Sequence, residues 1–212
     1  MLGAAHPYSR GLHEIGADVW AWLEPDGGYG RSNAGLVRGR GSSWLVDALF
    51  DLPMTERMLA AMAEVTVGAP LRDAVLTHAD GDHTHGTQLL GPEVRILAAA
   101  GTRRSGSAAS GCACRTRPST ERSPWTSADA RWGSRTSGPP TPPPTRSCTS
   151  PTPGWLFAGD LLFIGGTPVV WAGPTGNWIA ACDTMVALGA PTVVPGHGPV
   201  TDPDGIRASP TT

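Results

Sequence analysis

The pattern of apolar and polar positions divides the chain into two regular outer parts and an irregular middle part. In the first hundred residues, short apolar runs typical of strands occupy 16–24, 32–39, 42–51, 71–78 and 92–100. Residues 54–65 have the spacing of a helix, with Leu59, Met62 and Ala63 on one face. The pattern returns with expected strands at 154–160 and 191–198 and an expected helix at 177–189. Alternating strands and helices predict an α/β fold.

The middle part, residues 101–153, contains no Val, Ile, Leu, Met or Phe, and it holds nine of the 21 prolines. Such a segment cannot bury enough apolar surface to offset the entropy of ordering it, which is typical of a linker. We therefore expect little regular structure there, although a structureless insert of this length is unusual in a compact domain. The chain is interpreted as one domain, 1–212, with an anomalous segment at 101–153.

Charge and composition narrow the classes of protein. All 16 basic residues are arginine, and eight of them lie in the middle segment with only two acids, so the rest of the chain has a formal charge of −8. A negative folded part argues against a nucleic-acid partner. The sequence contains no run of 18 apolar residues, so we expect no membrane span. Its first residues lack the basic stretch followed by an apolar stretch that is typical of a secretory signal, so we expect none. Four cysteines without a framework pattern fit a reducing compartment, so we expect a cytoplasmic protein of undetermined oligomeric state.

The stretch THADGDHTHG, residues 77–86, carries the candidate chemistry. It places His78, Asp80, Asp82 and His83 directly after an expected strand. Imidazole and carboxylate side chains bind divalent metals, and clustering them on one loop fixes a coordination angle. A polar surface turn is the alternative, but four ligand-type side chains at this spacing favour a metal site.

The motif resembles the metallo-β-lactamase superfamily, whose hallmark is His-x-His-x-Asp-His at the end of a strand. Downstream, FAGDLLF resembles the family's bridging-aspartate segment and supplies Asp160, and VVPGHGPV resembles its last histidine segment and supplies His197. The run 35–51 resembles the family's early hairpin, with Asp47 at the end of the second strand. The resemblance implies an αββα sandwich with the metals at one edge, between the two sheets.

By this resemblance, one metal is held by Asp82, His83 and His197, and Asp160 bridges to a second held by His78 and Asp80. The implied enzyme is a hydrolase with one or two Zn²⁺ ions. A metal-activated hydroxide would attack an ester, thioester, lactone or amide carbonyl of a small molecule, and Asp82 would orient the nucleophile and move its proton. Two alternatives stay open. Two histidines and a carboxylate also suit Fe²⁺ in a thiol or persulfide dioxygenase, and an incomplete site suits a non-catalytic metal-binding remnant.

Two departures from the family pattern stand out. Asp80 occupies the position of the usual second histidine, and no histidine lies between His85 and His197 to supply a third. Read in another frame, residues 138–160 permit GPAHTAADTVVHVPDAGWLFAGD, with a histidine encoded across Pro140 and Thr141. A frame-shifted stretch would also account for the missing apolar residues of 101–153, and we favour it over a true linker.

The remaining candidates are weaker. Asp47 is expected to orient the ligand loop, with helix capping as an equal alternative. His85 is a candidate for contact with the ligands or the substrate, although a solvent-facing histidine is the simpler interpretation. Three residues are candidates for lining a substrate pocket, although aromatic residues near the start of a helix are more often packing residues: Trp171, Asn177 and Trp178.

Overall fold

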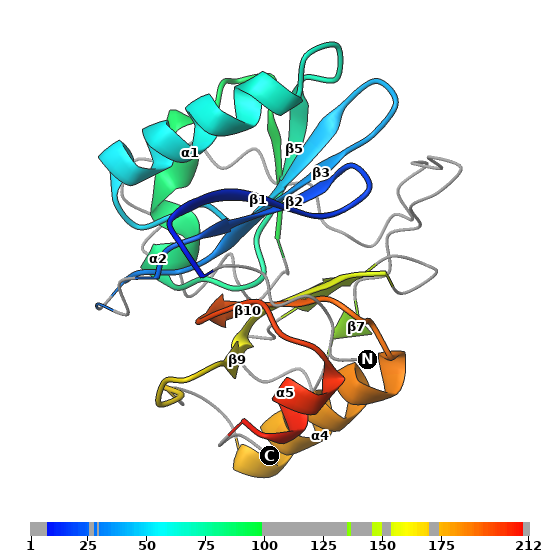
Figure 1. Ribbon diagram of the computed structural model, residues 1–212. Helices are drawn as coiled ribbons and strands as arrows, with labels where there is room; N and C mark the ends of the chain where they lie inside the picture. The colour runs from blue at the N-terminus through cyan, green and yellow to red at the C-terminus, as the bar shows by residue number, and fades with distance from the viewer. Residues whose placement is uncertain are drawn as a thin grey trace.

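The computed structural model describes residues 8–25, 28, 30–98, 135–136, 146–149, 154–169 and 174–209. Two β-sheets lie face to face at the centre, with helices on the outer side of each (Figure 1). The αββα architecture expected from the resemblance is therefore confirmed.

The first sheet has six strands in chain order. They are β1 (Gly11–Gly16), β2 (Val19–Leu23), β3 (Ala34–Arg38), β4 (Ser43–Val46), β5 (Leu71–Val75) and β6 (Arg95–Leu97). The first four strands pair antiparallel, whereas β4, β5 and β6 pair parallel. Because parallel neighbours need a crossover, the chain passes from β4 to β5 through α1 (Leu52–Val65) on the outer face.

Helix α1 begins after Asp51, whose side chain accepts a hydrogen bond from the Met54 backbone amide. Its buried face is a row of methionines four residues apart, namely Met54, Met58 and Met62. The expected face was therefore partly wrong, because Ala63 is exposed and Leu59 is only half-buried. The buried face begins one turn nearer the N-terminus of the helix than the expected face, which was inferred from apolar residues in the later turns.

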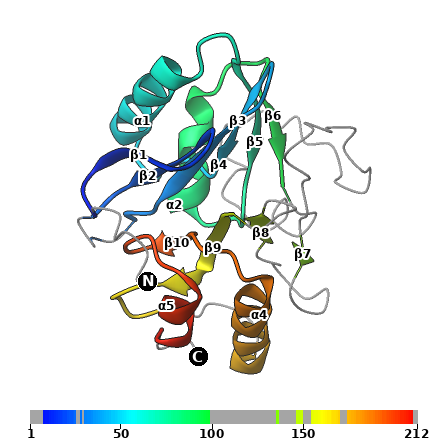
Figure 2. The ribbon, with the colours of Figure 1, turned by 45° about the vertical axis from the view of Figure 1, so that its right-hand side comes forward.

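The second sheet has the order β10 (Val193–His197), β9 (Leu156–Phe163), β8 (Arg146–Thr149) and β7 (Arg135–Thr136). Strand β10 is parallel to β9, whereas the other pairs are antiparallel. Helices α4 (Thr175–Leu188) and α5 (Pro203–Arg207) lie on its outer side (Figure 2).

Strands β7 and β8 fall within 101–153, where little regular structure was expected. Backbone pairing of Cys148 with Phe157 and of Thr149 with Leu156 joins β8 to the edge of β9. These strands are short, and they can form because a ladder needs only backbone groups and not apolar side chains, so the expectation of little regular structure in 101–153 stays a prediction. The other positions of 101–153 lie outside the described residues.

Alternation along the strands builds three apolar layers. Val37, Trp44 and Val46 point between the sheets and meet Phe157 of β9. Their neighbours Leu36 and Leu45 point outward and pack under α1, in the second cluster. The third layer lies between the second sheet and its helices and includes Leu156, Leu162, Cys182, Met185 and Ile206.

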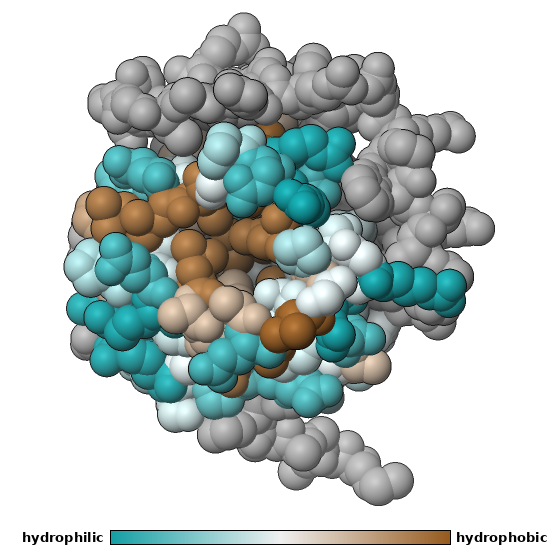
Figure 3. Space-filling model, turned by 90° about the horizontal axis from the view of Figure 1, so that it is seen from above, coloured by the Kyte–Doolittle hydropathy of each residue, from teal (hydrophilic) through white to brown (hydrophobic). Residues whose placement is uncertain are grey.

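Part of the layer under α1 reaches the surface. Its partly buried members include Leu12, Trp20, Leu59 and Val65. Figure 3 shows apolar side chains gathered in a hollow on the face that carries α1, ringed by polar ones. In the described ranges, no helix is long and apolar enough to cross a membrane.

Candidate metal centre

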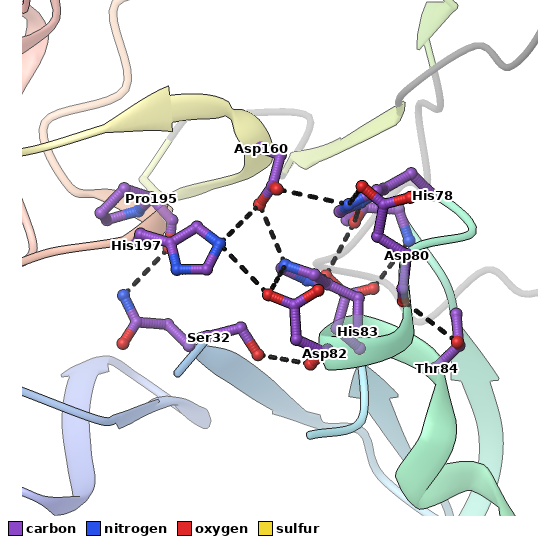
Figure 4. Close-up of polar contacts among 12 residues, drawn as sticks. Ser32, His78, Asp80, Asp82, His83, Thr84, Asp160, Pro195 and His197 are labelled. Carbon is purple, nitrogen blue, oxygen red and sulfur yellow. Dashed lines mark hydrogen bonds and ion pairs between the residues drawn. The ribbon is translucent and has the colours of Figure 1, made fainter. Parts of the chain in front are cut away.

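Three segments meet at one edge of the two sheets. The loop after β5 carries His78 and Asp80, and the one-turn helix α2 (Gly81–Thr84) that follows carries Asp82 and His83. From the second sheet come Asp160, within β9, and His197, the last residue of β10. The six candidate ligands thus come from both halves of the chain, and Figure 4 shows Asp160 between His78 on one side and His197 on the other.

One group of ligand atoms surrounds the first carboxylate oxygen of Asp160. Its Oδ1 lies 2.9 Å from His83 Nε2 and 3.2 Å from His197 Nε2. The Oδ2 atom of Asp82 is 3.4 Å from His197 Nε2 and 3.7 Å from His83 Nε2. These separations are those of atoms that share one small cation with ligand bonds of about 2.0–2.2 Å.

A second group lies on the other side of the same carboxylate. Asp160 Oδ2 is 3.5 Å from His78 Nε2, which is 3.6 Å from Asp80 Oδ2. Single ligand atoms of His78, His83 and Asp160 also lie within 4.8 Å of one another, as do those of Asp82, His83 and His197. Asp80 belongs to neither of these tighter groups, and its side chain is 43% exposed.

The residues fit a divalent cation. Three buried side-chain atoms of the described residues have no hydrogen-bond partner: His78 Nε2, His83 Nε2 and Asp160 Oδ1. Buried polar atoms are rarely left unpaired, because each loses its bonds to water without replacement. Here the unpaired atoms are all lone-pair donors aimed at a common region, which is the arrangement that a bound metal ion satisfies.

Without a cation, protons neutralise the cluster. Burial lowers the pKa of His78, as does the neighbouring His83, but the Asp160 and Asp80 carboxylates outweigh both and raise it to about 9. Burial likewise opposes the charge on His83, yet Asp160 and Asp47 raise its pKa well above the ordinary value. Burial raises the pKa of Asp160, but the charge of His83 and contacts with the three imidazoles hold it well below its usual range. A metal ion must therefore displace protons from these histidines.

The comparison with known families agrees with this geometry. The family model described as the metallo-beta-lactamase superfamily matches residues 27–100 and 123–197. The chain belongs to the metallo-β-lactamase superfamily. No curated protein sequence matches it.

Solved structures of superfamily members share the fold. A metallo-beta-lactamase from Pontibacter korlensis aligns with a TM-score of 0.74 and 18% identity, over 94% of this chain and 96% of its own. One from Erythrobacter litoralis aligns with a TM-score of 0.72 and 21% identity, over 92% of each chain. The enzyme FIM-1 from Pseudomonas aeruginosa, in its mono-zinc form, aligns with a TM-score of 0.70 and 20% identity, over 95% of this chain and 94% of its own. The superfamily fold binds divalent metals and supports metal-dependent hydrolysis.

Asp47 lies directly behind the ligand loop. It is buried at the end of β4, in the left-handed region with φ of 60°. Its Oδ2 accepts from the Thr77 hydroxyl (2.7 Å) and lies 2.8 Å from His83 Nδ1, while Oδ1 accepts from the Thr77 amide (2.7 Å). Since the Thr77 hydroxyl donates to Asp47, it accepts from His78 Nδ1 at 2.9 Å. Both histidines therefore turn Nε2 toward the cluster.

The other candidates lie apart from the cluster. The His85 ring packs 4.9 Å from Phe50, and His85 belongs to neither tight ligand group. The Trp178 indole donates to the Leu161 carbonyl (2.7 Å) and packs into the layer under α4, while Asn177 is exposed. Neither is among the residues that line the cavity over the cluster. The contact of Trp178 with β9 agrees with the packing alternative, and a part of Asn177 and Trp178 in substrate binding stays a prediction. Trp171 lies outside the described residues.

A cavity of about 780 Å³ opens over the cluster. Asp80, Asp82, Asp160 and His197 form its floor. Its walls include Tyr8, Arg31, Phe50, Phe163, Ile164 and Val169. Phe163 also stacks on the His197 ring, with ring centroids 4.7 Å apart and planes 11° apart.

Sequence reasoning missed the contacts of residues 31–33 with the ligand segments. The Arg31 carbonyl accepts from His197 Nδ1 at 2.9 Å, and the Ser32 hydroxyl donates to the Asp82 carbonyl. The only signal was a pair of polar residues, Ser32 and Asn33, at the start of an apolar strand.

Proposed function

We propose that this protein is a metal-dependent hydrolase that cleaves an ester, thioester, lactone or amide bond of a small molecule. The observation that carries the proposal is the set of unpaired lone pairs on His78, His83 and Asp160, next to a cavity of about 780 Å³ whose floor includes Asp160. Cavities of about 300–1,000 Å³ are typical of small-molecule sites. Membership in the superfamily supports hydrolysis as the reaction class.

Each residue has a distinct part in the proposal. Asp82, His83, His197 and Asp160 would hold one divalent ion, with Zn²⁺ the expected metal, and His78 and Asp80 would complete a second site with Asp160. The bound ion supplies the Lewis acidity that makes water nucleophilic near neutral pH and polarises a carbonyl. Asp82 orients the attacking water and accepts its proton, since its carboxylate lies at the cavity floor.

The walls of the cavity support a preference among substrates. Phe50, Phe163, Ile164 and Val169 present apolar surface on the way to the metal cluster, and Phe50 and Val169 are 44% and 43% exposed. We expect an apolar acyl or alcohol group to lie against them while the scissile carbonyl faces Asp82. The partner is a small molecule rather than nucleic acid or a membrane.

The test is a substrate panel on metal-analysed protein. Purified protein is assayed for metal content and then offered esters, thioesters, lactones and β-lactams, together with metal-stripped protein and the Asp82→Asn variant. Hydrolysis that needs the metal and falls at least a hundredfold in Asp82→Asn supports the proposal, because general acid–base catalysis contributes about 10²–10⁴-fold. Wild-type rates in the metal-stripped protein would refute it.

A second candidate function rests on the group Asp82, His83 and His197. Two histidines and one carboxylate within 4.8 Å of one another also match a non-haem iron site, which in this superfamily would indicate oxidation of a thiol or persulfide. Metal analysis of anaerobically purified protein separates the two candidates. Bound iron with thiol-dependent oxygen uptake favours the dioxygenase, and bound zinc without uptake favours the hydrolase.

A further inference from the structure

Three consecutive residues at the start of β3 contact ligand segments from both halves of the chain. The Arg31 carbonyl accepts a hydrogen bond from the ring of His197. Ser32 donates one to the backbone of Asp82 (Figure 4). The next residue, Asn33, contacts the turn around His197 at three points. One short stretch thus touches the two ligand segments that must meet for the first metal ion to bind.

Asn33 forms hydrogen bonds with the backbone on both sides of His197. Its side-chain nitrogen donates to the Pro195 carbonyl at 3.0 Å and to the Gly198 carbonyl at 2.8 Å. Its backbone amide donates to the Gly196 carbonyl at 2.8 Å. Asn33 is 3% exposed, so these bonds form away from water, where an unpaired partner is costly.

The orientation of the Asn33 amide is itself fixed. Its side-chain oxygen accepts from the Glu24 backbone amide at 3.2 Å. Glu24 is fully buried at the end of β2, where its carboxylate accepts from Trp22 Nε1 (3.1 Å) and Arg10 Nε (2.7 Å). With the oxygen held by Glu24, both hydrogens of the Asn33 amide face the 195–198 turn.

We propose that Asn33, assisted by Ser32, is a positioning residue that sets the distance between His197 and the Asp82–His83 turn. The inference rests on the proposed metal site. An asparagine suits the role because it supplies two donors and one acceptor from one planar group. An ionised aspartate has the same shape but no donor, and it would oppose the Pro195 and Gly198 carbonyls. The single Ser32 hydrogen bond fixes the α2 side of the same gap.

The test measures Co²⁺ binding to metal-free protein, so it needs no substrate. The variants are Asn33→Ala, Asn33→Asp and Ser32→Ala. The matched control is Ser43→Ala, because Ser43 is a fully buried residue of the neighbouring strand whose hydroxyl donates to the Ala69 carbonyl at 2.7 Å, away from the ligands. Co²⁺ affinity and the visible absorption of the bound ion are recorded, and urea unfolding of the metal-free form gives stability.

We expect the Asn33 variants to bind Co²⁺ about 10–100-fold more weakly and with an altered spectrum, as for other residues that orient metal ligands. Ser32→Ala should fall between them and the control, and Ser43→Ala should lose stability but keep wild-type Co²⁺ affinity. Asn33 variants that lose stability yet bind Co²⁺ normally would overturn the proposal. If the Asn33 variants do not fold, wild-type Co²⁺ affinity and spectrum in Ser32→Ala overturn it. Wild-type protein that binds no Co²⁺ would instead refute the metal centre and with it the proposed function.

Discussion

The two sides of the Asp160 carboxylate differ in how completely they surround a cation. On the Oδ1 side, His83, His197 and Asp82 complete a set of four protein ligands with Asp160. On the Oδ2 side, only His78 and Asp80 approach among the described residues, and Asp80 is 43% exposed. Ligands of the first side are held from behind by Asp47 and by residues 31–33, whereas Asp80 makes no capping hydrogen bond at the start of α2. Among the described residues, the Oδ1 side therefore offers a more complete set of candidate ligands for a cation than the Oδ2 side.

The largest expected effect is the difference between His197→Ala and His78→Ala in affinity for the first Zn²⁺ ion. Four-ligand zinc sites bind with about 10–16 kcal/mol, so one ligand contributes about 3–4 kcal/mol, a factor of several hundred in affinity. We expect His197→Ala to lose the first Zn²⁺ by about this factor, and His78→Ala to change it much less. Competition titration against a chromophoric chelator measures both. Equal losses in the two variants would mean that the two sides are not different.

The next effect concerns the missing histidine. As written, we expect the chain to keep close to one metal ion after dialysis and to hydrolyse slowly. A version with 101–153 in the other frame gains the histidine encoded across Pro140 and Thr141, should bind the second ion about a hundredfold more tightly, and should hydrolyse faster. Elemental analysis and initial rates are compared for the two proteins. Identical metal content and rates would show that the histidine was never needed.

Stability against pH gives a smaller effect. The pKa of His78 is raised from 6.5 to about 9, so its contribution to the stability of the metal-free protein is complete below pH 6.5 and is lost as the pH rises to about 9. We expect the free energy of unfolding to fall by on the order of 2 kcal/mol between these values. Urea unfolding at several pH values measures this, with His78→Gln as the comparison. A wild-type profile with the same slope as that of the variant would contradict the prediction.

The smallest effect is expected from Asp80→His. An imidazole at this position restores the family pattern on the weaker side, but the side chain is partly exposed, so we expect about a tenfold gain in affinity for the second ion. Asp204→His, at a highly exposed position away from the site, serves as control. Calorimetric titration of protein already holding one ion distinguishes them, and equal heats for both variants would remove Asp80 from the site.

The ligand segments could be predicted from sequence because each is a short motif that lies in a strand or directly after one. The residues that fix them could not. Asn33 meets its partners 162 and 165 positions away, and those partners are backbone carbonyls, which every residue has. Spacing along α4 likewise does not say which residues face β9, as Trp178 does.

The contact between Arg31 and His197 joins residues 166 positions apart. Contacts of such long sequence separation form slowly, since closing the loop costs entropy before any contact compensates for it. The centre therefore assembles only when the two sheets dock, late in folding. During refolding in the presence of Co²⁺, the visible absorption of the bound ion should consequently appear after the helical circular dichroism signal. The absorption would then report the time at which the two halves dock.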